Sequence, residues 1–183
     1  MGAIQTLKPI KLDYKNARCF MQTGDLLSWR SDTLLGAGIR LFTRGHVNHS
    51  SIVADINEYG KSRKFCLEAL EGGIELHCIS RRLKNFKGKV YWHKLRNEYK
   101  DYRTEIGTAA FSRIGIDYDY GSLFRQLVGR VSLNAKKLFC SEFVYLNFVD
   151  AKVPGAFKDA IAPNPQELFS SHLFWGQPVL IKE

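Results

Sequence analysis

The amino-acid sequence predicts a single α+β domain built around one antiparallel sheet. Its 183 residues can form one domain with a core but are too few for two ordinary domains. A hydrophobic share of 45%, with no internal repeat or low-complexity tract, is typical of a globular chain. A strand and a helix come first along the chain, then mostly consecutive strands, then helices, which is an order expected of α+β folds.

The first half of the chain supplies most of the predicted sheet. "GDLLSW" at 24–29 follows a glycine turn and predicts a first strand. The next segment, 31–45, has apolar residues at helical spacing. Ser31 or Asp32 can cap this helix, and Gly45 can end it. The further predicted strands are 49–57, a hairpin of 64–70 and 74–79 around Gly72-Gly73, and 89–95.

The second half of the chain is mainly helical. Apolar residues recur at helical spacing over 98–113, and Cys140 opens a later, strongly apolar helix. Between these two helices, "GIDYDYGSLFRQLVG" predicts a turn followed by a short helix. The remaining elements are a loop with a helical turn at 162–174 and a last strand at 177–181.

The strong positive charge of the chain suggests contact with anionic material. The formal net charge is +9, and basic residues gather at 61–64, 81–89 and 135–137. None of these runs has the interleaved aromatic residues of a nucleic-acid recognition motif, so we expect no specific nucleic-acid binding. Peripheral contact with an anionic surface fits the charge, and ordinary solvated basic faces fit it equally well.

Localisation and cofactor use are bounded by what the sequence lacks. There is no signal-peptide core and no run near the ~18 apolar residues of a membrane span, so we expect a cytoplasmic protein. As a separate expectation, the chain is a monomer. Release by lysis or by a dedicated secretion machine stays open. The four cysteines contain no Cys-x-x-Cys pair, and we expect neither a metal nor a cofactor. Cys66 and Cys78 flank the predicted hairpin turn and could be neighbours across it; the preferred interpretation is two buried apolar thiols.

One cysteine stands where a nucleophile could. In "KKLFCSEFVYLNF", Cys140 lies at the expected entrance of a helix. Free N–H groups and the helix dipole in a first turn favour a thiolate over a thiol. A buried cysteine can also be a simple apolar filler, and the stretch alone leaves both readings open.

A cysteine nucleophile needs a base, and the base needs a group that orients it. Of the five histidines, His49 is the best placed because it leads a predicted strand. His46 lies on a turn, while His77 and His93 lie in charged strands and are expected to face solvent. Glu68 interrupts an apolar strand, and a carboxylate there is costly to bury without a partner. It is either the orienting group or an outward-facing strand residue.

Six short motifs follow one another along the chain in a fixed order. They are Gly24-Asp25-Leu26-Leu27, His49-Ser50-Ser51-Ile52-Val53, Glu68-Ala69, Gly115-Ile116-Asp117-Tyr118-Asp119, Cys140-Ser141-Glu142-Phe143-Val144 and Pro165-Gln166-Glu167-Leu168. Over roughly residues 23–181 this order resembles the circularly permuted NlpC-like branch of the papain superfamily, and more narrowly the YiiX-type permuted papain-like amidases. His49 precedes Cys140 by 91 residues, which reverses the papain order and marks the permutation. Ser51 departs from the pattern, since relatives often have glycine there.

The resemblance implies a permuted papain-like domain over 1–183, with a lead-in at 1–22 and a core at 23–181. A central antiparallel sheet or half-barrel would pack against helices, with the nucleophile at a helix N-terminus. Catalysis would use Cys140 as nucleophile, His49 as base and Glu68 as orienting group. The backbone N–H of Cys140 would donate to the oxyanion. Tyr118 would lie near that oxyanion or the substrate, or else be a core aromatic.

The implied activity is hydrolysis of an amide through a thioester acyl-enzyme. The amide could belong to a peptide, a peptidoglycan stem or an N-acyl amine. A lipid-directed thioesterase or acyltransferase would use the same Cys140–His49 pair, so the catalytic residues do not separate the two activities. A non-catalytic module that binds a polyanion is the alternative from another class.

Overall fold

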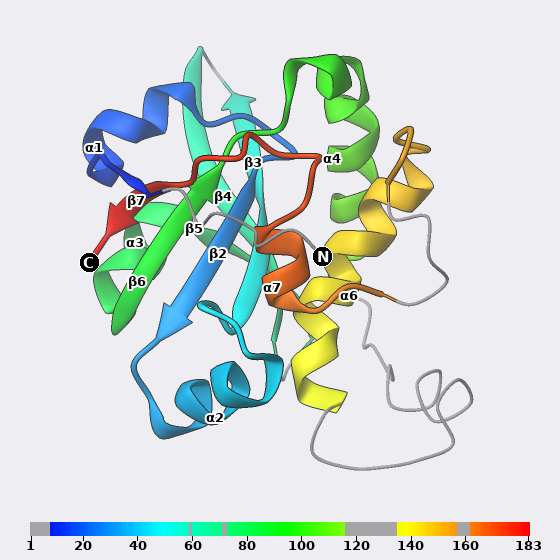
Figure 1. The fold of residues 1–183 in the computed structure, drawn as a ribbon. Coiled ribbons are helices and arrows are strands. Elements are labelled where there is room, and N and C mark those ends of the chain that lie inside the picture. Colours follow the sequence, from blue (N-terminus) through cyan, green and yellow to red (C-terminus); the bar gives the residue numbers. More distant parts are fainter. Residues whose placement is uncertain (1–7, 59, 71–72, 116–134, 157–161) are drawn as a thin grey trace.

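A seven-stranded mixed sheet forms the centre of the computed structural model, which describes residues 8–58, 60–70, 73–115, 135–156 and 162–183 (Figure 1). The strand order is β1-β7-β6-β2-β3-β4-β5, and every neighbouring pair is antiparallel except β1 and β7. The strands are β1 Ile10–Lys11, β2 Leu26–Ser31, β3 His49–Glu58, β4 Lys61–Leu70, β5 Gly73–Cys78, β6 Gly88–His93 and β7 Val179–Lys182. The predicted α+β class is confirmed, with one parallel pair at the sheet edge.

Helices cover both faces of the sheet. They are α1 Tyr14–Ala17, α2 Leu34–Thr43, α3 Ile79–Asn85, α4 Arg103–Phe111, α6 Ala135–Asp150 and α7 Pro165–Phe169, with 3-10 turns η1 Arg18–Phe20 and η2 Asn97–Tyr102. One buried apolar cluster joins the sheet to α4, α6 and α7, and a second joins its other face to α1 and α3. Burial on both faces explains why β2 shows a continuous apolar run, Leu26-Leu27, rather than alternation.

The lead-in segment is part of the fold. β1 extends the sheet beside β7, and Ala17 of α1 is buried in the second apolar cluster. Within the described residues, every helix is too short or too polar to span a bilayer.

The ends of α2 differ from the sequence-based expectation. The cap is Thr33, whose Oγ1 accepts a hydrogen bond from Gly36 N at 3.1 Å, because Ser31 is still in β2. The helix ends at Thr43, and its C-cap is Arg44, which adopts the left-handed conformation with φ 49°, one residue before the predicted Gly45. The hydrogen bonds of the strand outcompete a cap at Ser31, which the local sequence allows.

The hairpin forms as predicted, but its cysteines do not both face the core. In the register of β4 and β5, Cys66 lies opposite His77 rather than opposite Cys78. Cys66 is buried and Cys78 is exposed just before α3, so the expectation of two buried thiols is wrong for Cys78. The alternation of side chains along a strand explains the difference. Cys78 is paired with Phe65, so it lies on the opposite face of the sheet from Cys66.

The predicted helix at 98–113 is split between η2 and α4. The turn and short helix expected after Gly115 lie, from residue 116 onward, outside the described residues.

Candidate active site

His49 is held at the first position of β3 by contacts with β2. It lies opposite Trp29 in the strand register, and Asn48 N donates to Trp29 O at 2.9 Å. The Asn48 side chain accepts from Ser31 N at 2.7 Å, which fixes the turn that leads into the strand. The His49 side chain is only 16% exposed. The ring is therefore placed by the backbone of the sheet and not by a free loop.

Glu68 lies in the middle of β4 with its side chain fully buried. Its Oε2 accepts a hydrogen bond from His49 Nε2 at 2.7 Å, and its Oε1 accepts one from His77 Nδ1 at 3.0 Å. Arg82 donates to both oxygens, through Nε at 2.7 Å and Nη2 at 3.2 Å. The reading of Glu68 as an outward-facing strand residue is therefore wrong.

These donors determine the charge of Glu68. Burial alone would raise the pKa of its carboxyl, but the hydrogen bonds and positive charges of His49 and Arg82 outweigh burial. Together they hold the pKa of Glu68 well below its usual range. The carboxylate is thus ionised at neutral pH and can support a charged imidazole.

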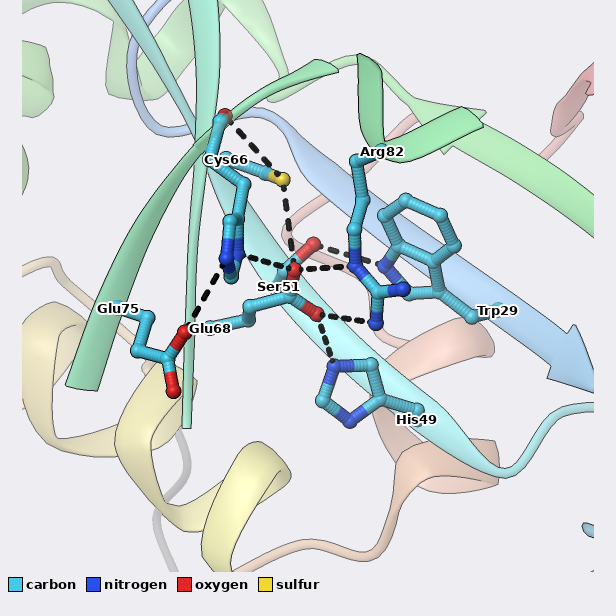
Figure 2. A network of polar contacts seen from close by, with 8 residues as sticks. Trp29, His49, Ser51, Cys66, Glu68, Glu75 and Arg82 are labelled. Carbon is cyan, nitrogen blue, oxygen red and sulfur yellow. Dashed lines mark hydrogen bonds and ion pairs between the residues drawn. The ribbon is translucent and has the colours of Figure 1, made fainter. Parts of the chain in front are cut away.

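Arg82 is itself fixed by aromatic side chains. Its guanidinium lies 5.2 Å from the centre of the Trp29 ring and 5.7 Å from that of Phe86. Trp29 is oriented in turn by its Nε1–H, which donates to Ser51 Oγ at 2.8 Å. Figure 2 shows Glu68 between His49 and Arg82, with Trp29 behind the guanidinium. Ser51, the departure from the family pattern, thus positions the ring against which Arg82 packs.

Cys140 contacts His49 although 91 residues separate them. The two side chains share a hydrogen bond, and Cys140 is only 3% exposed. Because Nε2 of His49 is bonded to Glu68, Nδ1 is the ring nitrogen left for the thiol. In Figure 2 this second nitrogen points away from Glu68.

Those contacts set the charge of His49. Burial opposes the imidazolium, but the charges and hydrogen bonds of Cys140 and Glu68 outweigh burial and raise the pKa of His49 to about 10. The ring is therefore protonated at neutral pH. An imidazolium between a sulfur and a carboxylate is the arrangement that stabilises a thiolate.

Cys140 does not open its helix. Helix α6 begins at Ala135, so Cys140 is its sixth residue and lies in the second turn. Only the first turn of a helix has free N–H groups. The expectation that such groups stabilise the thiolate is therefore wrong, and so is the expectation that the Cys140 N–H is free to bind the oxyanion. His49, rather than the helix terminus, is the group positioned to stabilise a thiolate. Tyr118, expected near the oxyanion, lies outside the described residues.

The other histidines have different surroundings. His46 is exposed, and its ring is outside the Glu68 network. His77 is 34% exposed and contacts Glu68 and, through Nε2 at 3.1 Å, Glu75. His93 is buried against the Phe169 ring, and its Nε2 has no hydrogen-bond partner among the described residues. The expectation that His77 and His93 face solvent is wrong for His93 and holds only in part for His77.

The sequence does not single out Arg82, because it stands in the basic run 81–89, for which contact with an anionic surface and a solvated face are the two interpretations. The available signal was Glu68 itself, since a buried carboxylate requires a cation or several N–H donors. Asp25, in the Gly24-Asp25 motif, has a structural role. It is fully buried and accepts from Trp92 Nε1, Leu95 N and Arg103 Nη1 at 2.8–3.0 Å, which joins β2 to β6 and α4.

A metal centre is not evident in the part of the chain that the structure describes. No group of three or more His, Cys, Asp or Glu residues there is arranged to hold a metal ion.

Comparison with known proteins identifies the family and the fold. Residues 20–179 match the model of the family described as "Permuted papain-like amidase enzyme, YaeF/YiiX, C92 family". The crystal structure described as metalloprotein YiiX from Escherichia coli O157:H7 is similar in fold, with a TM-score of 0.54 and 17% identity over 87% of this chain and 88% of that one. No match was found among the curated proteins. Because the family model covers most of its length, the chain belongs to the family of permuted papain-like amidases.

Proposed function

We propose that this chain is a cysteine amidase with Cys140 as nucleophile, His49 as acid and base, and Glu68 as the residue that orients His49. One observation carries the proposal: His49 is hydrogen-bonded both to the Cys140 thiol and to the buried Glu68 carboxylate. Membership of the amidase family supports the reaction class.

The reaction would follow from these contacts. In the resting pair His49 already holds the proton of the Cys140 thiol, and the thiolate attacks the carbonyl carbon of the amide. The tetrahedral intermediate collapses when the C–N bond breaks and His49 gives its proton to the leaving amine. His49 then takes a proton from water, which attacks the thioester; the C–S bond breaks, the acid leaves, and the Cys140 thiolate is restored beside protonated His49. Throughout the reaction, the Glu68 carboxylate holds the orientation of the His49 ring and favours its protonated form.

Arg82 would act through Glu68 and not on the substrate. Its two N–H contacts hold the carboxylate in one orientation, so that Oε2 stays directed at His49. We therefore assign Arg82 as a positioning residue.

The substrate is an amide in a peptide, a peptidoglycan stem or an N-acyl amine. A thioesterase or acyltransferase acting on lipids is a second candidate, because a thioester on Cys140 serves both reactions. It is favoured by the leucines exposed on α2, the helix that precedes the strand of His49.

Intact mass spectrometry after incubation with amide, ester and thioester probes tests the proposal. An acyl adduct should form on the wild-type chain and be absent from Cys140→Ala. The class of probe that turns over distinguishes the amidase from the lipid enzyme. Adducts that form equally on both proteins would contradict a nucleophilic role for Cys140.

A further inference from the structure

One side of helix α2 faces β2. Gly36 is buried against β2, where an added Cβ would lie 2.9 Å from Ser31 O. Arg40, one turn later, donates a hydrogen bond to the same carbonyl. Gly36 and Arg40 therefore lie on the side of α2 that faces β2.

The opposite side of α2 is apolar and exposed. Leu34 is 93% exposed and Leu41 is 83% exposed, while Ala37 and Gly38 are exposed between them. These positions follow the spacing i, i+3, i+4, i+7, so they form one stripe along the helix. We call these four residues the α2 apolar face. Leucines this exposed, side by side on one helix face, are typical of an interaction site.

Basic residues lie at both ends of this helix. Exposed Arg44 caps its C-terminus. At its N-terminus, Asp32 N donates to Lys87 O at 3.2 Å, and Arg30 pairs with exposed Lys89 across β2 and β6. Asp32 is the single acidic residue in the sequence 30–44, which holds three arginines. The surroundings of the α2 apolar face are therefore positively charged, in keeping with the net charge of +9.

The position of α2 connects it to the candidate active site. The helix ends at Thr43, six residues before His49. Figure 1 shows α2 at the end of the molecule where β2 finishes and β3 and β6 begin. A surface that held α2 would lie next to the strand that carries the catalytic base.

We propose that the α2 apolar face docks on an anionic lipid bilayer. Leu34 and Leu41 would enter the headgroup region, while Arg44, Lys87 and Lys89 would contact lipid phosphates. The exposed leucines are complementary to the apolar acyl chains of a bilayer, and the basic residues at both ends of the helix are complementary to anionic headgroups. This inference rests on the proposed function in one respect: on a membrane, the substrates of the enzyme would be amphiphiles that carry acyl chains. Binding to the membrane itself does not require catalysis.

Vesicle co-sedimentation of the full chain carrying Cys140→Ala tests docking without any turnover. The vesicles are phosphatidylcholine alone, or phosphatidylcholine mixed with phosphatidylglycerol. We expect binding to the anionic vesicles that weakens as salt is raised. Leu34→Gln with Leu41→Gln should lower the partition coefficient at least about tenfold, since two leucines no longer leave water.

Phe20→Gln is the matched control. Phe20 is 61% exposed but lies on η1, at the other end of the molecule from α2 (Figure 1). It should leave vesicle binding unchanged, and all variants should keep the thermal midpoint of the parent because the altered side chains are exposed. The proposal is overturned if the parent binds neither vesicle, or if the double leucine variant binds as the parent does. It is also overturned if the parent is a dimer that the leucine variant dissociates, because a second copy would then cover the face.

Discussion

Replacing Glu68 by glutamine removes the charge at the centre of the candidate site while nearly preserving its shape. Among the described residues, the two Glu68 oxygens accept hydrogen bonds from N–H groups of His49, His77 and Arg82, and Oε1 also contacts the weakly polar Cys66 thiol. A glutamine side chain offers one acceptor oxygen, so its NH₂ group must face N–H donors. Glu68→Gln therefore weakens the support of the imidazolium and leaves Arg82 without its carboxylate.

The expected size of the effect follows from these contacts. A hydrogen bond to a charged group contributes about 1.5–3 kcal/mol, and 1.36 kcal/mol corresponds to one pH unit. Since the imidazolium of His49 stabilises the thiolate, losing its partner should move the pH profile of Cys140 alkylation upward by about one to two units. Breaking the buried pair with Arg82 should also lower the free energy of unfolding by about 3–5 kcal/mol.

Alkylation rates of Cys140 measured against pH, in wild type and Glu68→Gln, give the result directly. Circular dichroism and urea unfolding establish that the variant is folded under the conditions of the assay. Glu75→Gln is the matched control. Glu75 pairs with Glu68 across β4 and β5, and its side chain contacts His77 rather than His49. Its profile should match that of wild type. Superimposable profiles for Glu68→Gln and wild type would refute the role assigned to Glu68.

Further predictions concern Arg82, His93 and the remaining thiols. Arg82→Lys keeps the charge but loses the two-pronged contact and the aromatic packing, so the alkylation rate of Cys140 should fall several-fold; an unchanged rate removes Arg82 from the positioning network. Burial lowers the pKa of His93 to about 3, so the unfolded chain binds a proton that the folded chain does not between pH ~6.5 and ~3. The contribution of His93 to stability should fall by about 2 kcal/mol on going from pH 7 to 5, so urea unfolding of wild type and His93→Gln should differ in their pH dependence by that amount. Burial and the charge of Glu68 raise the pKa of the Cys66 thiol well above its usual value, whereas the Ser80 hydrogen bond lowers that of exposed Cys78. Peptide mapping after alkylation should therefore find Cys78 modified and Cys66 intact, and rapid labelling of Cys66 would contradict the assignment.

The main strands of the sheet could be predicted from the sequence, and so could His49, Glu68 and Cys140 as candidate site residues. Strand signals were strong because apolar runs and the Gly72-Gly73 turn are local features. The candidates emerged from residue type and order, since a glutamate inside an apolar strand is unusual.

The partners of those candidates could not be predicted, because they depend on tertiary placement. Arg82 packs against Trp29, 53 residues earlier, and no local pattern separates it from the solvated basic residues around it. The burial of His93 likewise depends on Phe169, which comes from a distant helix. The start of α6 was placed too late because helix boundaries are poorly determined by local propensity.

The central claim is that His49 makes Cys140 a nucleophile. Iodoacetamide alkylation of Cys140 at neutral pH, followed by peptide mapping in a Cys19→Ser/Cys78→Ser background, tests it most directly. Both replaced cysteines are exposed, so their removal leaves the buried thiols Cys66 and Cys140 to compete. We predict that Cys140 reacts much faster than Cys66, and that His49→Ala abolishes this advantage while the chain stays folded. Equal labelling of the two thiols, or a Cys140 rate unaffected by His49→Ala, would contradict the claim.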